Sequence, residues 1–349
     1  MVFSVDTVLN RKNTKLSNPI LDNGYDFNKS LFSEALEIIS NEQDGFFEEM
    51  NQYLDEGLAS SAITNMVKEF DFRTILEKIF DIFVGAIGRL GASFSAFLLN
   101  FVNDDAELKL YKNQLANYRG EVHYNKPYYE YRNFGINSFV TTEYSNIING
   151  LQIELVNDFS NISVRSKDEM SSVLSNLLEK YSRTEDQLSL IRGKLVGKNQ
   201  VSYEEYKDEL FNYFRTTESP INPKAKFYQK NIKGDRIHLA YKDFYNSKKQ
   251  ISIIKREQWK YRAEALKAKY AVRKYSLLSG VDKSLLEPAS MVTYNRIVSA
   301  RCKEIQEVCN IFVLYFSAKL DAIREYNITN KELLLLACKD IVKNKHLEN

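Results

Sequence analysis

The sequence predicts a mainly α protein, a bundle of long antiparallel helices with one small β-hairpin. Its 349 residues include 13 Gly and 5 Pro, too few turn-forming residues for an all-β sandwich or for an α/β enzyme rich in glycine loops. Apolar residues recur at helical spacing along most of the chain. An aromatic segment, 121–134, departs from that spacing and predicts the hairpin.

The first part of the chain predicts an arm followed by helices. Residues 1–28 show no sustained period and read as an irregular N-terminal arm. Residues 29–120 form an N-terminal helical region whose main element is an apolar helix over 71–102. The polar run that starts at Asn103 ends this helix.

The region 121–216 combines the hairpin with further helices. It begins with EVHYNKPYYEYRNF, in which Asn125-Lys126-Pro127 supplies the turn between two aromatic strands. Helices are expected to resume downstream of the hairpin. Ser202 followed by Glu205 is a capping-box pattern, which predicts a helix from there to about Arg215.

The region 217–349 predicts long helices. Two prolines make 217–224 the best hinge candidate. Residues 238–279 read as one basic helix, closed by Gly280. A second capping box at Thr329 predicts the start of a separate final helix.

Between these elements lies the clearest periodicity in the chain. Ten apolar residues recur at intervals of three and four, which predicts one buried stripe on a helix of roughly 35 residues. They are Met291, Tyr294, Val298, Cys302, Ile305, Cys309, Phe312, Phe316, Leu320 and Ile323.

No combination of residues predicts catalysis. The segment Gly193–Lys198 has three residues between its glycines where a phosphate loop needs four, so we interpret it as a helix end. Cys302 and Cys309 lie within the apolar stripe and read as core residues. The three histidines are scattered along the chain. We therefore expect no enzymatic activity, no cofactor and no metal site.

Charge is divided unevenly along the chain. Residues 1–160 carry 13 basic and 23 acidic side chains, a net charge of −10. Residues 161–349 carry 35 basic and 23 acidic side chains, a net charge of +12. Nearly all of the excess lies in 224–274, with 16 basic and 4 acidic groups. Such asymmetry indicates an acidic partner, nucleic acid or another copy of the chain.

The basic segment alternates cations with aromatic residues. This pattern is typical of contact with nucleic acid or an acidic protein, and it also arises when rings face a core and cations face water. The candidate contact residues are Lys242, Lys248, Lys249, Lys255, Arg256, Lys260, Arg262, Lys267, Lys269, Arg273 and Lys274. Any nucleic-acid contact should be driven by phosphates, because no sequence-specific motif is present.

The apolar segment 82–102 has two interpretations. Its small residues form rows that let another helix approach closely, either in a protein core or in a membrane. They are Gly88, Gly91, Ala92, Ser95 and Ala96. The length suits a bilayer. Arg89 opposes insertion, since a charge inside the span is costly.

The order of these segments resembles a family of virion structural proteins, of the inner head, from large contractile-tailed bacteriophages. The resemblance rests on FLLNFVNDDAELKLYKNQLANY (97–118), YYEYRNF (128–134) and IRGKLVGKNQVSYEEYKDELFNYFR (191–215). A long charged helix and a closing Cys-containing helix over 291–324 follow. The resemblance implies no catalytic residues.

The resemblance implies a non-enzymatic head or core component, made in the host cytoplasm and located in the virion. Its expected partners are other virion proteins, copies of itself, and packaged DNA bound without sequence specificity. Two alternatives stay open. One is an ejected, membrane-active or channel-forming virion protein that uses segment 82–102, and the other is an adaptor at the neck or tail.

Overall fold

A computed structural model describes most of the chain. The described residues are 30–41, 45, 48, 71–103, 106–124, 129–134, 138–217, 230–272, 277 and 281–348. The predicted N-terminal arm, and the predicted hinge apart from its first residue, lie outside them. The mainly α class is confirmed, because helices account for most of the described chain.

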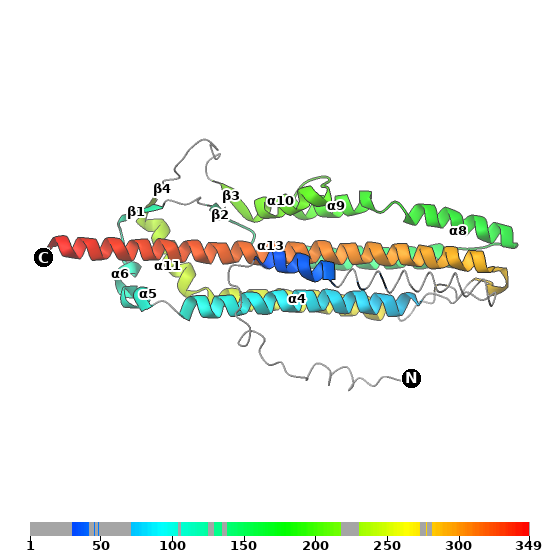
Figure 1. The fold of residues 1–349 in the computed structure, drawn as a ribbon, viewed down its shortest axis with the longest axis horizontal. Helices are drawn as coiled ribbons and strands as arrows, with labels where there is room; N and C mark the ends of the chain where they lie inside the picture. The colour runs from blue at the N-terminus through cyan, green and yellow to red at the C-terminus, as the bar shows by residue number, and fades with distance from the viewer. Residues whose placement is uncertain are drawn as a thin grey trace, which may run out of the picture.

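One helix runs the length of the molecule (Figure 1). α13, Pro288–Glu348, has 61 residues, or about 90 Å at 1.5 Å per residue. It begins at a proline, whose missing N–H costs nothing in the first turn, and no Gly or Pro follows. Nine of the ten predicted stripe residues are buried and Met291 is half-buried, which confirms the stripe.

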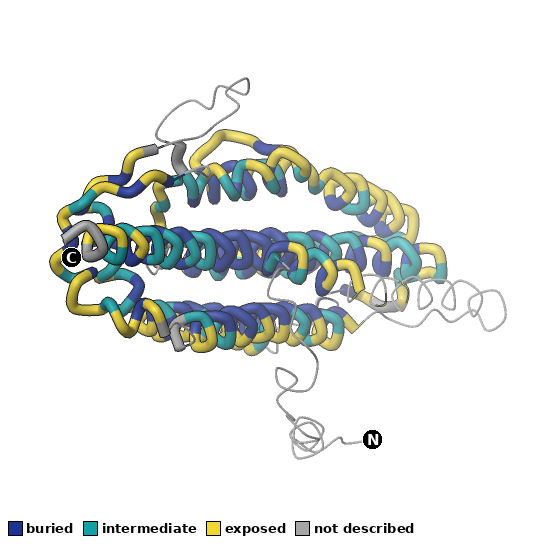
Figure 2. Tube along the Cα trace, turned by 60° about the vertical axis from the view of Figure 1, so that its left-hand side comes forward, coloured by how far each residue is buried: buried dark blue, intermediate teal, exposed yellow. Residues whose placement is uncertain are grey.

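Three long helices form a bundle with α13. They are α4 (Phe72–Asn103), α7 (Ser138–Ser160) and α12 (Lys248–Val272). In this bundle α4 and α7 each pack on α12 and on α13. A ring cluster joins them, since Tyr144 of α7 stacks on Phe83 of α4 at 4.6 Å and its centroid lies 5.2 Å from that of Phe312 in α13. Figure 2 shows the resulting buried interior running along α13.

Two neighbouring pairs of long helices run antiparallel, as expected from the sequence, whereas α4 and α13 run parallel, because Arg324 lies over Phe97 and Lys331 over Phe101. Along α12 and α4, Gln258 contacts Ile87 while Lys269 contacts Asp81, so the two run antiparallel. α7 and α13 also run antiparallel, because Tyr144 meets Cys309 and Glu154 meets Arg301.

A row of shorter helices lies along another side of α13. These are α8 (Lys167–Tyr181), α9 (Glu185–Val196) and α10 (Tyr203–Phe214) (Figure 1). The capping box that opens α10 is confirmed: Ser202 accepts from the backbone N–H of Glu205, whose carboxylate accepts in turn from Ser202.

The predicted hairpin is wrong in its pairing. Strands occur at both expected places, β1 (Glu121–Tyr124) and β2 (Tyr129–Tyr131), but they do not pair with each other. β1 pairs antiparallel with β4 (Lys230–Lys233), and β2 with β3 (Arg215–Thr217). The four strands thus form two separate two-stranded sheets. β3 ends at the first residue of the predicted hinge, 217–224, and β4 follows the hinge in the sequence.

A second, smaller core occupies the C-terminal end of α13. It is closed by α5 (Ala106–Leu110), α6 (Lys112–Ala116), α11 (Gly234–Tyr245) and the β1–β4 pair. Its buried members include Leu115, Val122, Ile232, Phe244, Leu334 and Cys338. α13 is therefore shared by two cores.

The described part of the basic helix expected over 238–279 is two helices, and the predicted end at Gly280 lies outside the described residues. α11 ends before Asn246 and Ser247, and α12 begins directly after them. The Asn246 side chain donates to the Lys242 carbonyl at 2.8 Å, and the Ser247 hydroxyl donates to the Phe244 carbonyl at 2.7 Å. Such side-chain bonds give the backbone an alternative to continuing the helix.

The second capping box does not start a helix, because α13 continues through Thr329 without interruption. Neighbouring Asn327 is fully buried. Its amide donates to Ile323, one turn earlier, and to Gln250 of α12, both at 2.7 Å. Tertiary contacts at this point override the local signal.

The helix over 31–41 is fixed by α13. The backbone N–H groups of Leu31 and Phe32 donate to the Asp321 carboxylate at 3.0 and 2.8 Å. A carboxylate at a helix N-terminus satisfies free N–H groups and complements the helix dipole. A 3-10 turn, Lys283–Leu285, precedes α13.

Candidate nucleic-acid interface

α12 has two distinct faces. Its inward face packs on α4 and α7 and reaches α13 through the side chains of Glu257 and Tyr261. This face is a stripe at helical spacing formed by Ile251, Ile254, Glu257, Tyr261, Ala265 and Ala268. The outward face of α12, which we call the α12 stripe, consists of Lys248, Lys255, Trp259, Arg262, Leu266 and Tyr270. Every member of the α12 stripe is exposed.

The cations of the α12 stripe lie in register. Lys248, Lys255 and Arg262 follow one another at intervals of seven residues, so successive members are about 10.5 Å apart along the axis and differ by about 20° in direction. Within the described chain none of the three forms an ion pair, and neither do exposed Lys249 and Arg256.

The other predicted contact residues form ion pairs within the chain, are half-buried, lie away from the stripe or lie outside the described residues. Lys267 pairs with Glu264 at 2.7 Å, and Lys269 lies 3.4 Å from Asp81 of α4. Lys260 is half-buried, and Lys242 is exposed on α11. Arg273 and Lys274 lie outside the described residues.

The aromatic residues of the basic segment divide in the same way. Trp259 is 69% exposed and Tyr270 is 54% exposed. Tyr261 and Phe244 are buried in the two cores. Some rings therefore face a core, and others lie among outward-facing cations.

A groove of about 250 Å³ lies between α4 and α12, beside Trp259. We call it the Trp259 groove. It is lined by Val84, Ile87 and Gly88 of α4 and by Lys255, Gln258, Trp259 and Arg262 of α12. Residues from the apolar segment and from the basic segment, which the sequence treats separately, thus share one site.

The small residues of α4 have different surroundings. Gly91 is buried, and a Cβ there would lie 1.9 Å from the Gln258 amide nitrogen. This close approach lets Gln258 donate to the Ile87 carbonyl at 2.8 Å, which fixes α12 against α4. Gly88 is exposed, and a Cβ there would meet nothing within 4 Å.

The remaining small residues lie toward the outside. Ala92 is exposed, and Ser95 and Ala96 are half-buried. The Ser95 hydroxyl donates to the Gly91 carbonyl at 2.7 Å. The row through Gly88 thus faces outward, and within the other row Gly91 makes the close helix contact.

A buried ion pair lies beneath the α12 stripe. Glu257 accepts from Lys319 of α13 at 2.6 Å, and both side chains are fully buried. Burial raises the pKa of Glu257 above its ordinary value, and the Lys319 charge opposes this shift. Because the Glu257 carboxylate is paired in the interior, it does not neutralise the exposed cations of the α12 stripe.

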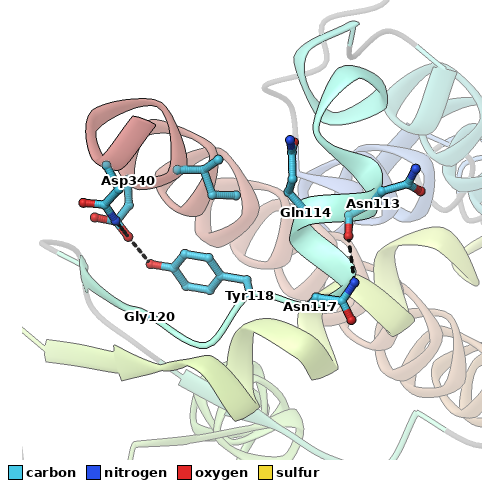
Figure 3. A pocket seen from close by; sticks show the side chains of 8 residues that line it. Asn113, Gln114, Asn117, Tyr118, Gly120 and Asp340 are labelled. Atoms are coloured by element: carbon cyan, nitrogen blue, oxygen red, sulfur yellow. Dashed lines mark hydrogen bonds between the residues drawn. The ribbon is translucent and has the colours of Figure 1, made fainter. Parts of the chain in front are cut away.

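A larger and more open groove, of about 530 Å³, lies near the C-terminal end of α13 (Figure 3). Its wall carries the amides of Asn113, Gln114 and Asn117, together with Tyr118 and Asp340. The Tyr118 hydroxyl donates to Asp340 at 2.8 Å, so the carboxylate of the groove is already engaged. Its lining holds no nucleophile beside a base.

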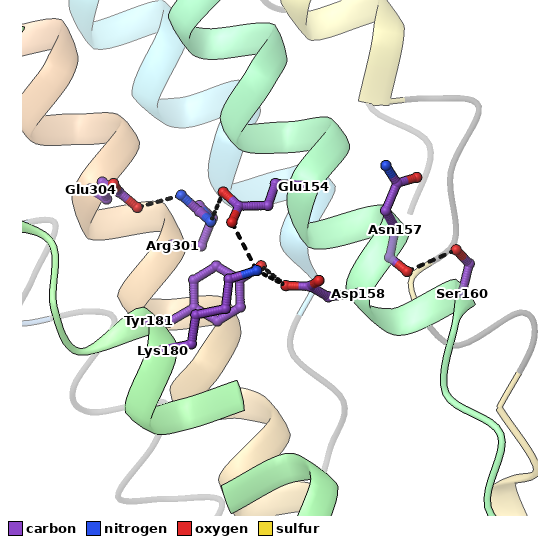
Figure 4. A network of polar contacts seen from close by, with 8 residues as sticks. All are labelled: Glu154, Asn157, Asp158, Ser160, Lys180, Tyr181, Arg301 and Glu304. Atoms are coloured by element: carbon purple, nitrogen blue, oxygen red, sulfur yellow. Dashed lines mark hydrogen bonds and ion pairs between the residues drawn. The ribbon is translucent and has the colours of Figure 1, made fainter. Parts of the chain in front are cut away.

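A polar network connects α7, α8 and α13 (Figure 4). Buried Arg301 binds Glu304 at 2.5 Å and Glu154 at 2.7 Å, and Lys180 binds Glu154 at 2.8 Å. Burial acts to raise the pKa of Glu154, and the two cations lower it overall. These ion pairs join α7, α8 and α13, so the network holds the three helices together.

The other predicted core features are confirmed. Cys302 and Cys309 are fully buried, and burial raises the pKa of Cys309 to about 12, so it is a poor nucleophile. Gly197 ends α9 in the left-handed conformation, as the helix-end interpretation requires.

Among the described residues, no three His, Cys, Asp or Glu side chains are grouped as metal ligands.

The buried pair of Glu257 and Lys319 was missed from the sequence, although a signal exists. Glu257 occupies a core position in the helical spacing of Ile254 and Tyr261. A charge at such a position predicts a buried partner on a facing helix.

A scan of protein-family models finds no match to this chain, and neither do searches of curated proteins and of solved structures.

Proposed function

We propose that the protein is a non-enzymatic structural component of a bacteriophage virion, inside the head, that binds packaged nucleic acid without sequence specificity along the α12 stripe. The location comes from the resemblance of the sequence. The binding mode is supported by one observation: the exposed cations at seven-residue spacing on α12, which have no acidic partner in the described chain.

The geometry of the α12 stripe suits a polyanion. Lys248, Lys255 and Arg262 span about 21 Å of helix axis, a length along which a nucleic acid presents many phosphates. Contacts to phosphates carry no sequence information, so binding of this kind is non-specific. It releases counterions, and its affinity therefore falls steeply with salt.

Charge reversal in the α12 stripe tests the proposal. We compare two double variants of equal charge change. One carries Lys255→Glu and Arg262→Glu in the stripe, and the control carries Lys339→Glu and Lys343→Glu. The control lysines are exposed on α13 and make no ion pair in the described chain. The DNA affinity of the full chain is measured at salt concentrations from about 50 to about 500 mM, a range over which phosphate contacts weaken strongly.

We expect the stripe variant to bind at least about tenfold more weakly and its salt dependence, d log K/d log[salt], to be shallower by about 1.8, from two lost contacts at about 0.9 each. The control should bind like the native protein. No salt-dependent binding by the native chain, or equal losses in both variants, would overturn the proposal. Mass spectrometry of purified particles tests the location.

A second candidate function is membrane insertion of α4 after ejection. Its segment Phe72–Phe101 has the length to span a bilayer, and an 18-residue stretch within it has a mean hydropathy of 1.7. In the fold, however, half of that stretch is buried, and α4 packs against α12 and α13 as a core helix. Flotation with liposomes, before and after mild acid, distinguishes the two: only the membrane function predicts that the protein floats.

A further inference from the structure

We infer that the Trp259 groove holds an unpaired base of a single-stranded nucleic acid, which stacks on the indole while Lys255 and Arg262 contact the flanking phosphates. This inference rests on the proposed function and adds to its phosphate contacts, which a duplex also makes, a base contact that only a single strand makes. It assigns a role to the groove that phosphate binding alone does not require.

The first step is the chemistry of the lining. One wall of the groove is an indole that is 69% exposed, and the other is the apolar surface of Val84 and Ile87. Every nucleobase offers a flat π-face to an aromatic ring, so stacking tolerates any sequence. The bases of a duplex already stack on one another and do not offer a free face.

The second step is charge. Lys255 and Arg262 lie one turn to either side of Trp259 and also line the groove. A base that enters between them brings its own phosphates within reach of both cations. This charge complementarity favours a phosphate-bearing ligand over a neutral apolar segment of a partner protein.

The third step is the open floor. Gly88 leaves the groove empty, since a Cβ at this position would meet nothing within 4 Å. Gln258, bonded to the Ile87 carbonyl at 2.8 Å, fixes the wall that carries Trp259 relative to this floor. The cleft is thus preformed by helix packing, which lowers the entropic cost of binding.

The chain has a single Trp, so its fluorescence reports on this groove directly. The probes are a thymidine oligonucleotide, a duplex of equal length, and an abasic oligomer that has phosphates without bases. We expect the thymidine oligonucleotide to quench the fluorescence. The duplex and the abasic oligomer should bind in a salt-dependent manner with little quenching.

Two variants test the two walls of the groove. Trp259→Ala should weaken binding of the thymidine oligonucleotide by roughly 5- to 150-fold, the range of a single base–aromatic stack, and Trp259→Phe should restore most of it. Gly88→Leu fills the floor and should weaken single-strand binding with less effect on duplex. Its control is Gly150→Leu on α7, an exposed helical glycine that also has nothing within 4 Å of its Cβ position.

The outcomes separate this inference from the proposed function. If no DNA binds in a salt-dependent way, the proposed function itself fails. If DNA binds but the indole is not quenched, or Gly88→Leu behaves like Gly150→Leu, the stacking groove is wrong and phosphate binding stands. If anionic vesicles or an acidic peptide shift the fluorescence and oligonucleotides do not, the ligand class is wrong.

Discussion

At the scale of single residues, the most consequential pair is Glu257 and Lys319, because it holds one carboxylate of α12 in the interior, away from the exposed cations. Both side chains are fully buried at 2.6 Å from one another. One Glu257 oxygen makes no hydrogen bond in the described structure. Desolvation of two charges is costly, so such a pair stabilises weakly as a whole while each member alone is strongly unfavourable.

We predict that Lys319→Met lowers the free energy of unfolding by about 3–5 kcal/mol, because it leaves the Glu257 carboxylate buried without its partner. Adding Glu257→Leu to the same chain should recover that loss, since the apolar pair needs no desolvation. Urea unfolding of the single and double variants measures both steps. A double variant as unstable as Lys319→Met would contradict the account.

At the scale of elements, capping shows how local signals and packing compete. Ser202 forms a complete capping box at the start of α10. Thr184 occupies the equivalent position before α9, but its side chain makes no capping hydrogen bond.

Ser202→Ala should therefore destabilise the protein by about 1 kcal/mol, the usual value of a lost N-cap. Thr184→Ala, the matched control, should change the stability by less than about half of that. Thermal or urea unfolding checks both variants. Equal losses at the two positions would show that the capping geometry does not determine the stability of these helix ends.

Periodicity predicted the elements that local sequence controls. The buried stripe from Met291 to Ile323, the apolar helix that became α4 and the helix begun at Ser202 all follow from spacing and capping. The pairing of the strands could not be predicted in this way, because partners separated by some hundred residues, such as Val122 and Ile232, leave no local pattern in the sequence.

The site was predictable in part for a related reason. The sequence names the cations and Trp259, but which of them face outward depends on the packing of α12. Seven-residue spacing places Lys255 and Arg262 outside. The same basic segment places Lys269 against Asp81 of α4, a pairing that depends on how two distant segments cross.

At the scale of the whole molecule, the charge division of the chain is partly neutralised by the fold. Acidic groups of the first part meet basic groups of the second: Asp81 with Lys269, Glu143 with Lys194, and Glu154 with Arg301. Only part of the positive excess is consumed in this way. The cations of the α12 stripe have no such partner among the described residues.

This neutralisation predicts a dependence of stability on pH. The pKa of Glu154 is lowered in the fold, because its bonds to Lys180 and Arg301 outweigh the effect of burial. A lowered carboxylate pKa contributes stability above the ordinary value of 4.5, and that contribution is lost as the pH falls through the folded pKa.

The native protein should accordingly be more stable than Glu154→Gln at neutral pH, and the difference should narrow as the pH falls below 4.5. Unfolding curves of both proteins across that range measure it. A gap that stays constant or widens on acidification would show that the Glu154 charge does not hold α7 against α8 and α13.

The most direct test of the central claim, that this protein acts by holding nucleic acid on the outer face of α12, is lysine footprinting of the full chain with and without DNA at low salt. The account predicts that Lys248, Lys249 and Lys255 become protected while Lys339 and Lys343 react unchanged, all five being exposed in the free protein. Uniform protection, or protection confined to the end of α13, would contradict it.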